Sequence, residues 1–135
     1  MQKDGKIFNI DSIIEKASLK KGQDLSKFIA QTLKEPEIDL IKQLGNLLGD
    51  KYMIHFFERV MSIQNNEGMY RKDNNQTNTK RTSGGILFYL IKTNEKENLE
   101  VKKLFKNHMK KIIKEKKLMK RIVKNISEIN INVNN

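Results

Sequence analysis

The sequence predicts an all-α fold: a compact helical domain with a basic loop and a long basic C-terminal helix. Through most of the chain, apolar residues recur every three or four positions, as they do on the buried face of a helix. Strong helix breakers stand between these segments, at Gly22, Pro36, Gly49 and Gly68. A length of 135 residues suits one small domain with an extension.

Residues 1–23 are expected to form an N-terminal amphipathic helical extension. Its helix lies within residues 7–19, begins near Asp11 or Ser12, and has one apolar face, made of Ile10, Ile13, Ile14 and Ala17.

Residues 24–98 are expected to form the helical domain itself. Asp24 is the predicted N-cap of a helix with the apolar stripe Leu25, Phe28, Ile29 and Leu33. Pro36 is placed at the first position of the next helix, which ends at Gly49. Asp50 is the predicted N-cap of the most buried helix, because that segment is apolar over much of its circumference, through Met53, Ile54, Phe56, Phe57, Val60 and Met61.

The segment from Met69 to Thr79 is polar, rich in asparagine and without periodicity, which predicts a flexible loop with a brief extended stretch at Met69 and Tyr70. Thr82 is the predicted N-cap of the apolar helix that follows. This start places Ser83, Gly84 and Gly85 at the first three helical positions, where backbone N–H groups have no partner within the helix.

Residues 99–126 predict a long basic amphipathic helix, and residues 127–135 a disordered tail. The apolar positions of the helix are Val101, Leu104, Phe105, His108, Ile112, Met119, Ile122 and Ile126. Three roles for its lysine-rich face remain open: a solvated face packed on the domain, an extension of an RNA footprint, or a surface for an anionic membrane or a calmodulin-like acidic partner.

The net charge of +11 and the isoelectric point near 9.8 indicate a polyanionic partner, namely RNA, DNA or an anionic membrane surface. The absence of cysteine excludes disulfides, thiolate metal sites and cysteine nucleophiles. Without an apolar run long enough for a signal or a membrane span, we expect a soluble intracellular chain.

No pattern of catalytic residues stands out, so we expect a protein that is not an enzyme and that uses no cofactor. His55 and His108 are interpreted as helix side chains and not as metal ligands. Glu37 and Asp39 suit the positive end of a helix dipole, which accounts for them without acid–base chemistry.

The stretch "KRTSGG" has two interpretations. The N–H groups of Ser83, Gly84 and Gly85 could bind a phosphate, with glycine allowing the anion to approach, or the glycines could merely permit a tight turn. Tyr70 could stack on an unpaired base or cover the core. Phe88 and Tyr89, within the apolar helix, are expected in the core.

Three motifs in order, "LKEPEIDLIKQLGNLLG", "NEGM" and "KRTSGGILFYLIK", resemble the RNA-binding domain of the phosphorylated adapter of RNA export (PHAX) family. The resemblance covers about residues 25–93. Arg81, Thr82, Gly84 and Gly85 match the family hallmark Arg-Thr-Pro-Gly-Gly, in which Ser83 takes the place of proline. The resemblance implies an all-helical domain that binds single-stranded or small nuclear RNA, in a nuclear export adapter that shuttles to the cytoplasm. It also implies a nuclear cap-binding complex and an export receptor as partners, through regions that are not recognisable in this chain.

The predicted RNA-binding residues are Tyr70, Arg71, Lys72, Lys80, Arg81, Thr82, Ser83, Gly84 and Gly85, with further contacts from Lys110, Lys114, Lys117 and Arg121. The alternative function is a helical module that binds a protein or a membrane surface through the basic C-terminal helix.

Overall fold

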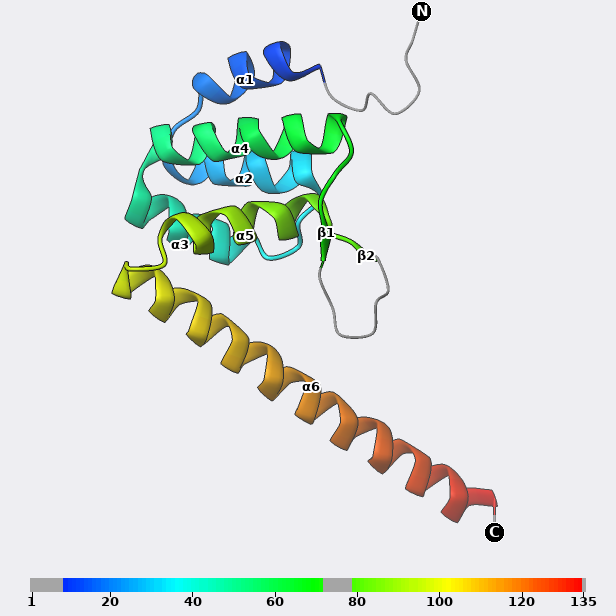
Figure 1. Ribbon diagram of the computed structural model, residues 1–135. Coiled ribbons are helices and arrows are strands. Elements are labelled where there is room, and N and C mark those ends of the chain that lie inside the picture. The colour runs from blue at the N-terminus through cyan, green and yellow to red at the C-terminus, as the bar shows by residue number, and fades with distance from the viewer. Residues whose placement is uncertain (1–8, 72–78, 135) are drawn as a thin grey trace, which may run out of the picture.

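The computed structural model describes residues 9–71 and 79–134 and confirms the all-α class. Its described elements are six helices and one short hairpin (Figure 1). The helices are α1 (Ile10–Ser18), α2 (Gly22–Leu33), α3 (Ile38–Leu48), α4 (Asp50–Asn65), α5 (Ser83–Asn94) and α6 (Leu99–Asn134). The strands are β1 (Tyr70–Arg71) and β2 (Thr79–Lys80), paired antiparallel.

The core lies among α2, α3, α4 and α5, with α1 against α4. Phe57 is fully buried in α4 and meets the ring of Phe28 edge-on, with 6.1 Å between the ring centroids. Phe56 is buried as well, but α2 and α5 bury a larger share of their residues than α4, so the prediction that α4 is the most buried helix is wrong. Each fully buried large apolar side chain contributes about 1.5–3 kcal/mol to folding.

Three helix starts differ from the sequence prediction, each by one to three residues. α2 begins at Gly22, with Lys21 as its N-cap, so Asp24 lies in the first turn. Pro36 lies before α3, whose N-cap is Glu37. Gly49 is the N-cap of α4.

Asp50 does not cap its own helix because its carboxylate has a tertiary partner instead. Both of its oxygens accept from the Gly22 N–H, at 3.1 and 3.3 Å. Gly22 has a positive φ of 55°, which glycine adopts without strain. A contact between residues 28 positions apart thus sets the start of α2, and no local sequence pattern encodes it.

The β1–β2 hairpin lies directly before α5. Tyr70 pairs with Lys80 and Arg71 with Thr79, and the Arg81 N–H donates to the Met69 carbonyl at 2.7 Å. The predicted extended stretch at Tyr70 is therefore confirmed, and it continues to Arg71 instead of beginning at Met69. Thr79, at the other end of the predicted loop, lies in β2, and residues 72–78, including Lys72, lie outside the described residues.

α6 packs on the domain only through its first turns and then projects away from it (Figure 1). Val101 is buried, and Phe105 meets Phe88 edge-on at 5.9 Å. The helix continues to Asn134, beyond the end at residue 126 that the sequence predicts. After Gly85 the sequence contains no glycine or proline, and a helix that is already nucleated extends at little cost where nothing breaks it. Among the described helices, none combines the length and apolar character that crossing a bilayer requires.

The Tyr52 hydroxyl lies where α4 meets the end of α5, and it accepts a hydrogen bond from Asn94 Nδ2 at 3.1 Å. Burial is the main cause that raises the pKa of Tyr52 to about 12, and Glu95 raises it further, while the bond from Asn94 opposes the shift.

The Tyr52 phenol is therefore expected to keep its proton above the pH at which an unperturbed tyrosine loses it. An unperturbed tyrosine has a pKa of about 10, so the stability contributed by the neutral Tyr52 is complete below pH 10 and is lost as the pH rises towards 12. Ultraviolet titration of tyrosinate should show a late phase that Tyr52→Phe removes. A late phase that persists in Tyr52→Phe would contradict this assignment.

Candidate nucleic-acid interface

The start of α5 has the geometry that the sequence predicts. Thr82 is the N-cap, with extended backbone angles, and its Oγ1 accepts from the Gly85 N–H at 3.0 Å. Ser83, Gly84 and Gly85 form the first turn of the helix. The hydroxyl of Ser83 also accepts from Gln64 Nε2 at 2.8 Å, which ties the α5 start to the end of α4.

Gly84 is glycine because the side chain of Glu35 lies directly against it. Gly84 is buried, and a Cβ at this position would overlap the carboxylate and stand 2.8 Å from Cγ of Glu35. Such distances are far inside normal van der Waals contact, so no other residue fits without moving Glu35. The Glu-Pro and Gly-Gly motifs, which are far apart in the sequence, therefore meet in one contact.

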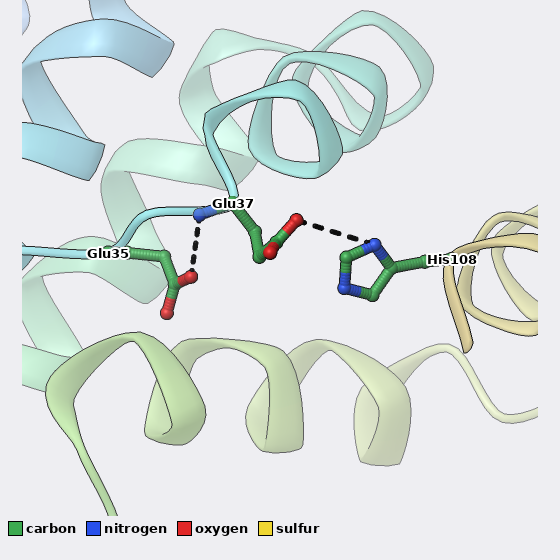
Figure 2. Close-up of polar contacts among 3 residues, drawn as sticks. All are labelled: Glu35, Glu37 and His108. Carbon is green, nitrogen blue, oxygen red and sulfur yellow. Dashed lines mark hydrogen bonds and ion pairs between the residues drawn. The ribbon is translucent and has the colours of Figure 1, made fainter. Parts of the chain in front are cut away.

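Backbone hydrogen bonds fix both the main chain and the carboxylate of Glu35. Lys34 ends α2 in the left-handed region with φ 56°, and the Glu35 N–H donates to the Ala30 carbonyl at 2.8 Å. Oε2 of Glu35 accepts from the Glu37 N–H at 2.8 Å, and Glu37 lies in turn 3.7 Å from Nδ1 of His108 on α6 (Figure 2). No local pattern in the sequence indicates the contact between Glu35 and α5.

The contact with Glu35 changes how the first turn of α5 can meet an anion. The positive end of a helix dipole favours a negative charge, and here a carboxylate of the protein already lies beside that end. The Gly85 N–H donates to Thr82 and is not available while this cap is in place. Of the three N–H groups predicted to bind an anion, the Gly85 N–H thus has a partner in the cap.

The consecutive residues Lys80 and Arg81 each hold a cation over a tyrosine ring. Nζ of Lys80 lies 5.9 Å from the ring centroid of Tyr70, and Cζ of Arg81 lies 4.4 Å from that of Tyr89. Both rings remain open to solvent, with Tyr70 52% and Tyr89 41% exposed. The surface therefore offers two exposed aromatic rings with a cation over each.

The prediction that Tyr89 lies in the core is wrong, whereas Phe88 is half-buried and packs against the core. Tyr89 follows Gly85 by four residues and shares the outer face of α5 with it. The hydroxyl of Tyr89, four residues after Gly85, was the feature of the sequence that could have indicated an exposed position. The neighbouring residues are all strongly apolar, so the segment was predicted to be buried on every face.

The cationic side chains of this surface form no ion pairs with carboxylates in the described part of the chain. Arg71 and Lys80 are exposed and Arg81 is half-buried, and none of the three forms an ion pair within residues 9–71 and 79–134. The remaining predicted contacts lie on α6, far along the sequence from Arg71, Lys80 and Arg81. All four are exposed on one face of that helix: Lys110, Lys114, Lys117 and Arg121.

The two histidines have separate surroundings. His55 is exposed and edge-on to Phe56, while His108 lies beside Glu37 where α6 meets α3. In the part of the chain that the structure describes, no three histidine or acidic side chains gather in a way that could hold a metal ion.

One family model matches the chain over most of its length. The family model for the RNA-binding domain of the phosphorylated adapter RNA export protein matches residues 25–117, which is more than half of the chain and runs from α2 into α6. No curated protein and no solved structure shows a significant match. The family resemblance found in the sequence is thereby confirmed.

Proposed function

Since the chain belongs to the family of RNA-binding domains of the phosphorylated adapter RNA export protein, we propose that it recognises single-stranded or small nuclear RNA through the surface formed by the hairpin and the α5 start. The matched family is defined by RNA binding within an adapter and not by a reaction, and we propose no enzymatic role.

The observation that carries this proposal is the pair of exposed tyrosines, Tyr70 and Tyr89, with Lys80 and Arg81 over their rings. Unpaired RNA bases stack on exposed aromatic rings, and their phosphates pair with nearby cations. A duplex keeps its bases stacked inside, so this arrangement favours single-stranded segments, loops or ends over duplex RNA.

Each predicted site residue has a role in this proposal. Arg71, Lys72, Lys80 and Arg81 neutralise phosphates, and Tyr70 and Tyr89 stack on bases. Thr82 and Ser83 fix the start of α5: Thr82 accepts from the Gly85 N–H, and Ser83 accepts from Gln64. Gly84 leaves space for the Glu35 side chain, and Gly85 leaves space for the Thr82 cap. On α6, Lys110, Lys114, Lys117 and Arg121 extend the contact to the RNA backbone.

In the cell, the proposed role is RNA recognition within a nuclear export adapter that shuttles to the cytoplasm. The family supports a nuclear setting through its function in RNA export. We propose that the cap-binding complex and the export receptor bind regions of such an adapter other than this domain.

Replacing Lys80 and Arg81 together by alanine is expected to weaken RNA binding and its dependence on salt. The four phosphate contacts from Arg71, Lys72, Lys80 and Arg81 contribute about −2.8 to the slope of log affinity against log salt, because each contact to a single strand contributes roughly −0.7. The double variant should reduce this contribution to about −1.4. Fluorescence anisotropy with a labelled single-stranded RNA and a matched duplex, across a salt series, measures both quantities.

The matched control is Lys21→Ala with Lys51→Ala, which removes the same charge from two exposed side chains. Lys51 lies at the opposite end of α4 from the hairpin, and Lys21 precedes α2, whose first residue contacts Asp50. Equal loss of affinity in both double variants would show that net charge alone attracts RNA. A preference for the duplex would overturn the stacking part of the proposal.

A further inference from the structure

The projecting half of α6 carries an apolar stripe that no described segment covers. Eight side chains that contribute to it are 42% to 60% exposed: Met109, Ile113, Leu118, Met119, Ile122, Val123, Ile126 and Ile129. The family match ends at residue 117, so the stripe from Leu118 onward lies beyond the RNA-binding domain. RNA binding by that domain does not account for it.

Four of these side chains, Met119, Ile122, Ile126 and Ile129, lie on a seven-residue repeat that runs along α6 and is apolar except at His108 and Glu115. Starting at Val101, the seam positions are spaced alternately by four and three residues: Val101, Phe105, His108, Ile112, Glu115, Met119, Ile122, Ile126 and Ile129. The first of these side chains is buried, and the next two are half-buried where α6 packs on the domain. A repeat of this kind, sustained over several heptads, is the pattern of a helix that packs lengthwise against another helix.

The side chains around the projecting seam are strongly basic. Between Ile113 and Ile129 the cations are Lys114, Lys116, Lys117, Lys120, Arg121 and Lys124, against the two carboxylates Glu115 and Glu128. Met119 and Val123 line a shallow apolar hollow that is bordered by Lys116, Lys120 and Lys124. In the portion of α6 with described side chains, none of these cations forms an ion pair.

This charge distribution decides which kind of helix fits the seam. A second copy of the chain would bring two rows of lysine together, and like charges beside a helix seam oppose pairing. An acidic helix would place carboxylates opposite Lys111 and Lys116, the lysines that flank the seam, and charges that flank a coiled-coil seam select the partner in this way.

We propose that the projecting half of α6 binds an acidic amphipathic helix of a partner protein, with Leu118, Met119, Ile122, Ile126 and Ile129 packed against that helix. Lys110, Lys114, Lys117 and Arg121 lie on the opposite face of α6. The seam can therefore hold the partner helix while the basic face contacts RNA. This inference does not depend on the proposed RNA function.

The test uses the full chain and a labelled synthetic helix of about 28 residues, with leucine and isoleucine at the seam and glutamate at the flanking positions. A second peptide carries lysine in place of glutamate. Fluorescence anisotropy should show that the acidic peptide binds and that the lysine peptide does not. Equal binding of the two peptides, or binding of neither, would overturn the proposal.

Ile122→Gln with Ile126→Gln should weaken binding of the acidic peptide by about tenfold or more, because each substitution replaces an apolar side chain of the seam with a polar one. The matched control is Asn125→Gln with Ser127→Gln, which introduces the same side chain in the same turns but off the seam, and it should bind like the wild type. Circular dichroism should show equal helix content in all three proteins. An unchanged affinity in the seam variant would overturn the assignment of the seam.

Two other occupants give distinct results that would also overturn the proposal. Binding to vesicles of phosphatidylserine and phosphatidylcholine, without binding to the acidic peptide, would identify a lipid surface. A dimer detected by light scattering and abolished by Ile122→Gln with Ile126→Gln would identify a second copy of the chain. RNA affinity should stay unchanged in the seam variant, so failure of this proposal is separable from failure of the RNA proposal.

Discussion

Replacing Gly84 by alanine is expected to lower the free energy of unfolding by about 1–3 kcal/mol, because the new methyl group overlaps the Glu35 side chain at a buried position. Glu35 cannot move away without cost. Its carboxylate would lose the bond from the Glu37 N–H, and a hydrogen bond to a charged group is worth about 1.5–3 kcal/mol. Urea unfolding followed by circular dichroism measures the difference.

Glu35→Ala provides the decisive partner variant, since it removes the atoms that the Gly84 methyl group would strike. In the double variant, Gly84→Ala should cost much less than it does alone, which gives a coupling free energy between the two sites. Additive effects would show that the destabilisation comes from elsewhere.

Gly85→Ala is the matched control for the same exchange one residue later. A Cβ at Gly85 would stand 3.0 Å from Thr82 Oγ1 and 3.9 Å from Cβ of Arg81, so the contact is tight but involves no carboxylate. Alanine also favours a helix over glycine by about 1 kcal/mol, which offsets the closer contact. We therefore expect Gly85→Ala to be close to neutral, and a loss as large as that of Gly84→Ala would contradict the explanation based on Glu35.

Tyr89→Ala and Tyr70→Ala are each expected to weaken single-stranded RNA binding by about five- to 150-fold, because stacking one base on an aromatic ring contributes roughly 1–3 kcal/mol. Tyr89→Phe and Tyr70→Phe keep the ring and should retain most of the affinity. Anisotropy at one fixed salt concentration separates these outcomes. Since both rings are exposed, the alanine variants should unfold at nearly the wild-type urea concentration.

The contact between Arg81 and Tyr89 makes a further distinction possible. If the guanidinium orients the ring for a base, Arg81→Ala and Tyr89→Ala should not be additive in RNA affinity. Wild-type affinity in Tyr89→Ala would remove this ring from the interface and leave the hairpin cations as the binding surface.

Much of the fold could be predicted because the signals for it are local. The positions of the helices follow from apolar spacing, and the α5 cap follows from a threonine placed before residues whose N–H groups need a partner. Membership of the family could also be predicted, since Arg81, Thr82, Gly84 and Gly85 are adjacent in the sequence. The RNA-contacting residues remain a proposal.

The tertiary structure decided what distant segments do to one another. The sequence by itself determined six helices, a basic loop and a capped Gly-Gly helix start, because each depends on a few neighbouring residues. Only the folded chain showed that Gly84 makes room for Glu35 and that Tyr89 faces solvent under Arg81. It also showed that the apolar seam of α6 continues beyond the part of the helix that packs on the domain. Steric exclusion and burial depend on which surfaces meet, and helical periodicity specifies a face of a helix without specifying what covers it.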